Sequence, residues 1–155
     1  MTDITEGSKA PAFDMATADG GRVSSEGLAG KPYVLYFYPK ADTPGCTNEA
    51  RDFSEQIDAF AAAGATVIGV SRDPVKKLDR FKAKFDLKVV LASDEPEDVT
   101  EAWGVWVEKK LYGREYMGIE RATFLIDGTG AVRRVWRKVS VKGHAAEVLA
   151  AVQSL

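Results

Sequence analysis

The sequence predicts an α/β fold, in which a central sheet carries helices on both of its faces. Continuous apolar runs alternate with segments whose apolar residues recur every three or four positions, a pattern typical of strands separated by amphipathic helices. No composition shift, low-complexity tract or internal repeat divides the chain. At 155 residues the chain is long enough to bury one sizeable core. We therefore expect one domain over residues 1–155.

The N-terminal part predicts a short hairpin followed by a buried strand. Residues 13–17 and 22–24 flank Asp19-Gly20-Gly21, and an Asp-Gly step suits the positive φ of a tight turn. Tyr33–Tyr38 is a continuous apolar and aromatic run, which is typical of a strand covered on both faces. Pro39 then ends that strand.

Two helices and a second strand are expected next. The first helix spans Cys46–Ala63 and ends at Gly64, and its apolar face consists of Ala50, Phe53, Ile57 and Phe60. Thr66–Ser71 predicts a second buried strand. Asp73 and Pro74 are expected as the N-cap and first residue of the next helix, whose apolar face consists of Val75, Leu78, Phe81 and Phe85.

The second half predicts a smaller set of elements. They are a strand at 88–92, a short helix at 96–103, two hairpin strands at 121–126 and 132–139, and a closing helix at 144–152. Between 104 and 120 no element is predicted, and the chain passes through Gly113 and Gly118.

The single cysteine, Cys46, lies where a buried strand gives way to the first long helix. A lone cysteine forms no intrachain disulfide, so its chemistry needs another molecule to restore the thiol. Ligands bind at this end of strands in open α/β sheets, and a helix N-terminus favours a thiolate. The alternative is a small buried hydrophobe. Pro44 and Gly45 directly before the sulfur are turn formers, which favours chemistry.

Pro39, Thr43 and Cys46 reproduce the Pro-x-x-x-Thr-x-x-Cys signature, and on these residues the chain resembles the peroxiredoxins. Residues 36–52 are similar to the bacterioferritin-comigratory protein, or peroxiredoxin Q, subfamily, and the likeness extends to residues 116–127. The resemblance implies a thioredoxin-like fold with the N-terminal β-hairpin as an extension.

The resemblance also implies a role for each site residue. Cys46 would be the peroxidatic nucleophile, which attacks one peroxide oxygen and becomes a sulfenic acid. Thr43 would hydrogen-bond the thiolate and the peroxide, and Pro39 would shield the site from water. Arg121 would hold the thiolate and polarise the peroxide oxygens, because breaking the O–O bond places negative charge on the leaving oxygen. Glu49 would orient Arg121; the alternative is a solvent-facing glutamate in the first helical turn.

The resolving cysteine of this subfamily is missing from both of its usual positions. Arg51 stands five residues after Cys46, and Lys82 stands at the alternative position on the following helix. We therefore expect an external thiol to resolve the sulfenic acid, either glutathione with glutaredoxin or thioredoxin. A monomer is expected, with a weak dimer as the alternative.

Charge and composition disfavour several other functions. The net charge of −2 provides no attraction to nucleic acid or to anionic membranes. The single histidine, His144, is expected on the surface at the start of the last helix, and no metal site or cofactor is predicted. The segment Met1–Lys9 lacks the features of a secretory signal, so we expect the cytoplasm.

The sequence therefore predicts a thiol-dependent peroxidase of the single-cysteine type, reducing hydrogen peroxide and organic hydroperoxides. The alternative is a non-catalytic redox sensor or thiol-binding thioredoxin-fold protein, whose oxidised cysteine signals to a partner. A dithiol oxidoreductase is disfavoured, because Thr43 stands where a Cys-x-x-Cys motif has its first cysteine.

Overall fold

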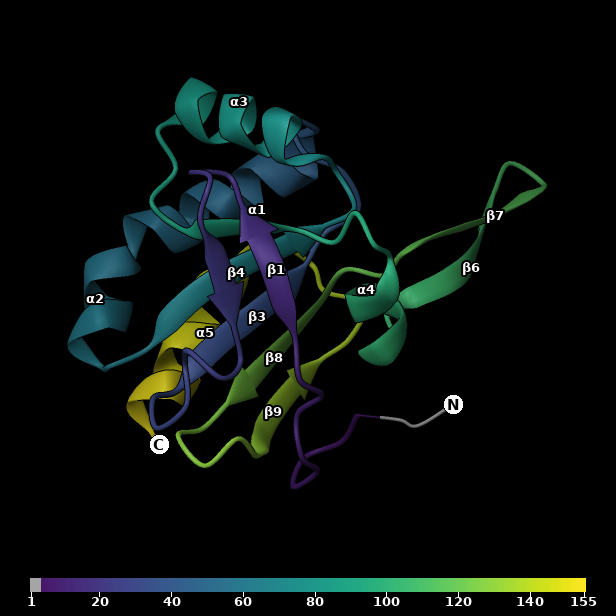
Figure 1. Cartoon of the computed structure of the whole chain (residues 1–155). Helices are drawn as coiled ribbons and strands as arrows, with labels where there is room; N and C mark the ends of the chain where they lie inside the picture. The colour runs from purple at the N-terminus through teal and green to yellow at the C-terminus, as the bar shows by residue number, and fades with distance from the viewer. Residues whose placement is uncertain (1–3) are drawn as a thin grey trace.

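A seven-stranded sheet with strand order β2-β1-β5-β4-β3-β8-β9 forms the centre of the computed structural model, which describes residues 4–155 (Figure 1). Its strands are β1 (Asp14–Thr17), β2 (Arg22–Ser24), β3 (Tyr33–Phe37), β4 (Thr66–Ser71), β5 (Val90–Ser93), β8 (Ala122–Ile126) and β9 (Val132–Trp136). β3, β4 and β5 are parallel, and β8 is antiparallel to β3. The first three residues of the segment Met1–Lys9 lie outside the described residues.

Helices cover both faces of this sheet, unevenly. The helices are α1 (Pro44–Glu55), α2 (Ile57–Ala62), α3 (Val75–Phe85), α4 (Asp98–Ala102) and α5 (His144–Gln153). α1, α2, α3 and α5 contribute to one buried apolar cluster, through Phe53, Phe60, Leu78 and Val148 respectively. α4 and the N-terminal segment contribute to the second cluster, through Val99 and Phe13. The predicted α/β fold with an N-terminal hairpin is confirmed.

Strand β3 lies inside the sheet, between β4 and β8, and leads into the helix that carries the cysteine. All five of its residues are buried, as its continuous apolar sequence predicts. The Tyr36 ring lies across Gly69 on β4, where an added Cβ would come within 2.5 Å of the ring. Only glycine permits this approach, which lets Tyr36 stack on Phe53 of α1 with ring centroids 4.7 Å apart.

The helix predicted over 46–63 is two helices. α1 begins earlier, at Pro44, and Gln56 separates it from α2. The Gln56 N–H donates to the carbonyl of Phe53, three residues back instead of four, at 3.1 Å. This tighter turn redirects the chain and leaves the Phe53 and Phe60 rings in contact, with centroids 5.8 Å apart.

The predicted cap of the next helix is shifted by one residue. α3 begins at Val75 with Pro74 as its N-cap, so Asp73 lies outside the helix. The Asp73 carboxylate is engaged elsewhere: its Oδ2 accepts hydrogen bonds from the Ala41 N–H and the Ser71 hydroxyl, both at 2.8 Å. Asp73 therefore bonds to the loop after β3 and to the end of β4, and it does not cap α3.

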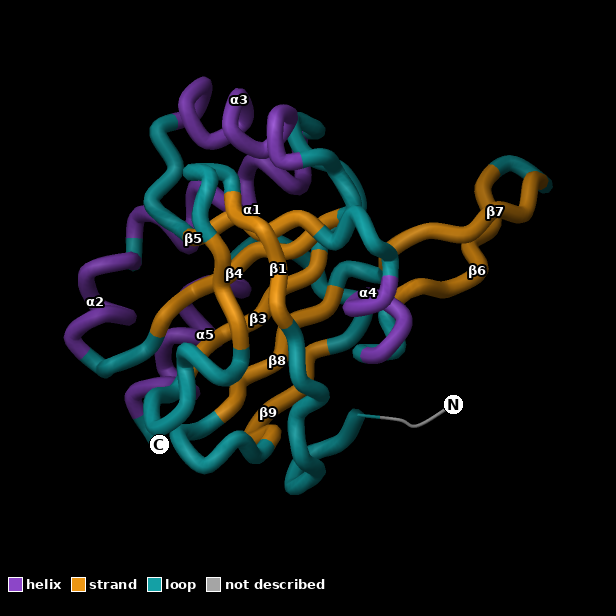
Figure 2. The backbone as a smooth tube through the Cα atoms, in the orientation of Figure 1, coloured by secondary structure: helices purple, strands orange, loops and turns teal. Residues whose placement is uncertain are grey.

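A second hairpin, which the sequence analysis missed, occupies the region without predicted elements. β6 (Trp106–Leu111) pairs with β7 (Arg114–Ile119) in a two-stranded sheet of its own. Tyr112 and Gly113 form the turn with φ of 52° and 77°, and two positive φ values match the twist of a two-residue hairpin. Figures 1 and 2 show this hairpin projecting from the body of the molecule.

The remaining differences are at the ends of strands and of the short helix, where α4 spans Asp98–Ala102 instead of residues 96–103. β5 begins and ends later than residues 88–92, β8 begins one residue after Arg121, and β9 ends at Trp136 instead of Val139. Lys138 has a φ of 49°, a backbone conformation that does not continue a strand. No helix within residues 4–155 is long and apolar enough to cross a membrane.

Candidate active site

Cys46 is the third residue of α1, at the carboxyl end of β3. Thr43 is the N-cap with extended backbone angles, and Pro44 is the first helical residue. The Thr43 carbonyl accepts the first helical hydrogen bond, from the Thr47 N–H at 2.8 Å. The first N–H groups of a helix have no partner within it, so this turn presents donors and the positive end of the dipole beside the sulfur.

Arg121 reaches the sulfur from the neighbouring part of the sheet. It directly precedes β8, which pairs with β3, and its Nη2 donates to Cys46 Sγ at 3.3 Å. The sulfur is nearly closed off from solvent, since Cys46 is only 2% exposed. Gly45 makes room for the guanidinium, because an added Cβ would lie 3.2 Å from Nη2. A side chain at position 45 would push the cation away from the sulfur.

Glu49 holds the other side of the same guanidinium. Arg121 Nη1 donates to Glu49 Oε1 at 2.7 Å, and the Glu49 side chain is 1% exposed. The alternative of a solvent-facing Glu49 is therefore wrong. Burial raises the pKa of Glu49 to about 7, although the Arg121 charge pulls it down. The second oxygen, Oε2, has no hydrogen-bond partner among the described residues.

Thr43 and Pro39 lie on the loop that leads from β3 into α1. The Thr43 hydroxyl donates to the Lys40 carbonyl at 2.8 Å, so its proton is committed to the loop and its oxygen stays available as an acceptor. Pro39 is exposed. The structure thus joins Cys46, Arg121 and Glu49 by hydrogen bonds, and within residues 4–155 neither Thr43 nor Pro39 bonds to the sulfur.

Two contacts that the sequence analysis missed hold this loop. Asp73 accepts the Ala41 N–H, as described above, and Lys84 of α3 pairs with Asp42 at 3.0 Å. Asp42 has a φ of 61°, a conformation that costs a non-glycine residue free energy. Because the partners come from elements far along the chain, local sequence pattern carried no signal for either contact.

His144 is buried, and the expected surface position is wrong. It is 5% exposed, its Nε2 is 2.8 Å from the Thr123 hydroxyl, and its ring makes edge-to-face contacts with those of Phe53 and Trp136. Burial lowers the pKa of His144 to about 4, so the ring is neutral near pH 7. Within residues 4–155 no group of three or more histidine, cysteine or acidic residues is placed to hold a metal ion.

Comparison with known proteins identifies the family of the chain. The AhpC/TSA family model matches residues 7–135. The chain belongs to the AhpC/TSA family. It is 48% identical to the putative peroxiredoxin bcp of Coxiella burnetii, covering 94% of this chain and 97% of that one, and 46% identical to peroxiredoxin Bcp of Bacillus subtilis, covering 98% and 97%. The chain is a member of the Bcp, or peroxiredoxin Q, group within the AhpC/TSA family.

Solved structures of this group have the same fold. A structure of Xanthomonas campestris peroxiredoxin Q superimposes with a TM-score of 0.90 at 41% identity, covering 97% of this chain and 99% of that one. Another structure, of the bacterioferritin comigratory protein of the same organism, concerns its alkyl peroxide reduction activity; it has a TM-score of 0.87 at 44% identity and covers 92% and 90%. The predicted thioredoxin-like fold is confirmed.

The AhpC/TSA membership confirms the predicted thiol-dependent peroxidase activity. The chain is a peroxiredoxin, a thiol-dependent peroxidase that acts on peroxides with a thiol reductant. This favours the peroxidase over the redox-sensor alternative. Two Xanthomonas campestris structures are serine variants at two different cysteines. The interval between those cysteines equals the interval between Cys46 and Lys82 of this chain, which has one cysteine.

Proposed function

We propose that this peroxiredoxin works by a single-cysteine mechanism centred on Cys46. The proposal rests on two hydrogen bonds at the first turn of α1, one between Glu49 and Arg121 and one between Arg121 and the sulfur. The Cys46 thiolate attacks one oxygen of the peroxide, forming an S–O bond as the O–O bond breaks. The leaving hydroxide or alkoxide takes a proton and departs as water or alcohol, and Cys46 becomes a sulfenic acid.

Each of the other residues either stabilises the negative charge that develops during the reaction or controls what reaches the sulfur. Arg121 stabilises the thiolate and then the oxygen that leaves, as a preorganised cationic donor. Glu49 fixes the guanidinium through Nη1, so that Nη2 stays on the sulfur. Thr43, whose proton is given to Lys40, accepts a hydrogen bond from the peroxide. Pro39, exposed beside the site, limits the entry of water to the sulfur.

The second half of the cycle uses a thiol from another molecule. Arg51 and Lys82 occupy the two positions where a resolving thiol would stand. An incoming thiolate therefore attacks Cys46, releasing hydroxide and forming a mixed disulfide, and a second thiol of the reductant frees Cys46. We propose glutathione with glutaredoxin or thioredoxin as the source, in the cytoplasm, with the chain acting as a monomeric single domain.

Replacement of the cysteine tests this proposal. We expect Cys46→Ser to abolish peroxide consumption with every reductant, because a hydroxyl is a far weaker nucleophile than a thiolate. The measurement is the steady-state loss of hydrogen peroxide and of an alkyl hydroperoxide. Glutathione plus glutaredoxin and thioredoxin plus its reductase are supplied in separate assays. Full consumption by Cys46→Ser would end the proposal.

A further inference from the structure

The β6–β7 hairpin carries most of the large hydrophobic side chains that the described residues leave exposed. They are Leu111 (53% exposed), Tyr112 (95%), Tyr116 (46%) and Met117 (49%), and the remaining one, Leu155, is at the C-terminus. Tyr112 stands at the tip with a positive φ, which is unfavourable for an aromatic residue. Exposed apolar side chains gathered on one projecting element mark an interaction surface.

The pairing register separates the hairpin residues into two faces. Val107, Lys109 and Leu111 of β6 lie opposite Gly118, Tyr116 and Arg114 of β7 on one face, which we call the thiol-side face. The Lys109 stem and the Tyr116 ring both pack over Gly118, as close contacts to its missing Cβ show. The other face carries Glu108, Lys110, Glu115 and Met117. All charges on the thiol-side face are therefore positive, whereas both acidic residues lie on the opposite face.

The thiol-side face adjoins the active site. β7 ends two residues before Arg121. Lys109, on this face, is close enough to Arg121 and Cys46 for their charges to act on it: burial and the Arg121 charge lower the pKa of Lys109, and the Cys46 charge opposes them. Tyr116 is the cross-strand partner of Lys109 and lies at the same level of the hairpin.

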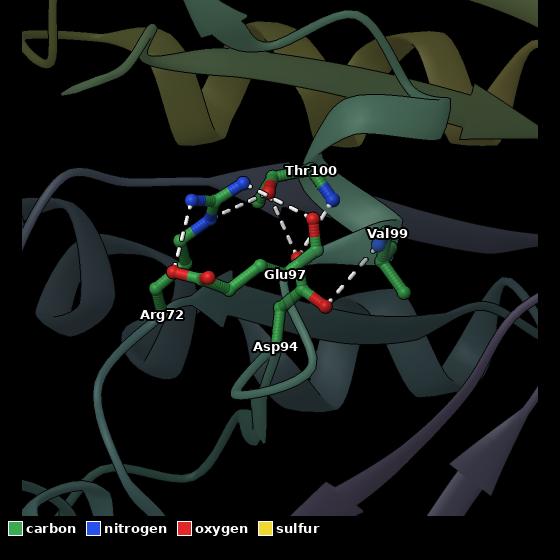
Figure 3. Close-up of polar contacts among 5 residues, drawn as sticks. All are labelled: Arg72, Asp94, Glu97, Val99 and Thr100. Carbon is green, nitrogen blue, oxygen red and sulfur yellow. Dashed lines mark hydrogen bonds and ion pairs between the residues drawn. The ribbon is translucent and has the colours of Figure 1, made fainter. Parts of the chain in front are cut away.

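The base of the hairpin is held firmly to the body. The Arg72 guanidinium lies 3.5 Å from the centroid of the Trp106 ring, and it also bonds to Glu97 and Thr100. Figure 3 shows the network that fixes Arg72, in which buried Asp94 accepts hydrogen bonds from Val99 and Thr100. A fixed base lowers the ordering cost when a partner binds.

The other end of the base is clamped as well. Arg137 donates to the Gly104 carbonyl before β6 at 2.8 Å and to Glu120 after β7 at 2.7 Å. Both strands of the hairpin are thus tied to the body where they leave it. The thiol-side face is consequently a preorganised surface beside Cys46.

We propose that the thiol-side face of the β6–β7 hairpin is the docking surface for a protein reductant, which presents an exposed thiol ringed by apolar and acidic residues. This inference rests on the single-cysteine mechanism, because only a chain without its own resolving thiol must bring a foreign sulfur to Cys46 in every cycle. The basic, apolar character of the face selects the complementary partner in an otherwise acidic chain.

The size of the face distinguishes a transient redox partner from a second copy of the chain. Two strands of six residues cover roughly 20 by 10 Å, on the order of 200 Å². A stable complex buries about 800 Å² on each partner, whereas transient redox encounters lie at the low end of the range. The face is therefore too small to hold a dimer together, and it suits a partner that must leave after each electron transfer.

The reaction between the docked protein and Cys46 needs no cofactor, because the thiols of the reductant supply both electrons. The thiolate of the docked protein attacks Cys46 Sγ, an S–S bond forms, and the sulfenic S–O bond breaks to release hydroxide. A second thiol of the reductant system then attacks the sulfur of the docked protein, which reduces the disulfide and returns Cys46 as a thiolate. The reductant loses two electrons in total, and the sulfenic acid gains them.

A matched pair of variants on opposite faces of the hairpin tests the proposal. Tyr116→Glu adds a negative charge to the thiol-side face, and Met117→Glu adds the same charge to the opposite face at a similarly exposed site. Turnover is measured with thioredoxin plus its reductase, with glutaredoxin plus glutathione, and with dithiothreitol alone. We expect Tyr116→Glu to raise the KM for the active protein reductant by about tenfold or more. Met117→Glu should leave that KM unchanged, and neither variant should alter turnover with dithiothreitol.

Several results would overturn the docking surface. They are an equal effect of the two glutamate variants, no effect of either, or a wild-type enzyme that no protein reductant accelerates beyond dithiothreitol. A hairpin-dependent dimer in analytical ultracentrifugation, with unchanged reductant kinetics, would assign the face to a second copy. Leu111→Glu repeats the test on the same face if Tyr116→Glu fails to fold, as judged by circular dichroism. A single-turnover burst of peroxide reduction by the wild type reports on the Cys46 mechanism separately.

Discussion

At the scale of single residues, the guanidinium of Arg121 donates hydrogen bonds to both the Cys46 sulfur and the Glu49 carboxylate. Nη2 donates to Cys46 and Nη1 to Glu49, so the planar guanidinium is fixed in orientation as well as in position. A lysine in its place would supply a point charge without this two-sided geometry. In the proposed mechanism, Arg121 therefore needs little reorganisation when charge develops on the peroxide.

Arg121→Ala is expected to slow sulfenic acid formation by at least about a hundredfold, because it removes a preorganised donor at the reacting atoms. Arg121→Lys should slow it less, since part of the positive charge remains. The measurement is the single-turnover rate with hydrogen peroxide. Removal of Arg121 also leaves the buried Glu49 without its cation, so Arg121→Ala/Glu49→Gln serves as the control. The double variant should regain stability but not rate, and recovery of the rate would contradict the role of Arg121.

At the scale of elements, the loop from β3 to α1 is shaped by partners on other elements. Asp73, just after β4, accepts the N–H of buried Ala41, and Lys84 of α3 pairs with Asp42. These contacts fix the segment between Pro39 and Thr43 to the residues after β4 and to α3. The position of Thr43 relative to the sulfur therefore depends on β4 and α3 as much as on the signature itself.

Asp73→Ala should destabilise the protein by about 1–3 kcal/mol, because the Ala41 N–H loses its partner in a buried place. It should also lower kcat/KM for peroxide, as the loop that carries Thr43 loosens. Lys77→Ala is the matched control: it removes only the 3.2 Å ion pair to the other Asp73 oxygen, worth less than about 1 kcal/mol at a partly exposed site. Urea unfolding and steady-state kinetics measure both. Equal losses in the two variants would argue against a positioning role.

At the scale of the whole molecule, two buried titrating groups beside the active site act on stability in opposite directions. Burial raises the pKa of Glu49 to about 7, so its contribution is fully present below its unfolded value near 4.5 and is lost as pH rises through 7. Burial lowers the pKa of His144 to about 4, so its contribution is present above pH 6.5 and is lost as pH falls through 4. Their effects oppose each other between about pH 4.5 and 6.5.

Single variants should separate these two effects. As pH is lowered from 7 to 4.5, the wild type gains stability from Glu49 and Glu49→Gln does not. The free energy of unfolding of Glu49→Gln should therefore fall relative to that of the wild type, by up to about 3 kcal/mol over this range. His144→Gln should change the slope in the opposite sense. Urea unfolding at several pH values measures both slopes. Parallel curves for the wild type and Glu49→Gln would show that the carboxyl has an ordinary pKa in the folded protein.

Most of the element order, and Cys46 as the candidate reactive residue, could be predicted because both depend on local pattern. The apolar run of β3, the periodic helices and the Pro39, Thr43 and Cys46 spacing are properties of neighbouring residues. The β6–β7 hairpin was missed because its residues are mostly exposed and show no apolar alternation. The Tyr112-Gly113 step between two runs of equal length was the available signal.

By itself, the sequence determined the fold class, and it predicted Cys46 as the reactive cysteine and an external thiol as its reductant. These follow from composition, local periodicity and the count of one cysteine. Only the tertiary structure decided that Glu49 is buried against Arg121, that His144 is buried beside Thr123, and that Asp73 ties down the active-site loop. The physical reason is that burial and hydrogen bonding between distant segments depend on how those segments pack together, and a local sequence pattern carries no information about that packing.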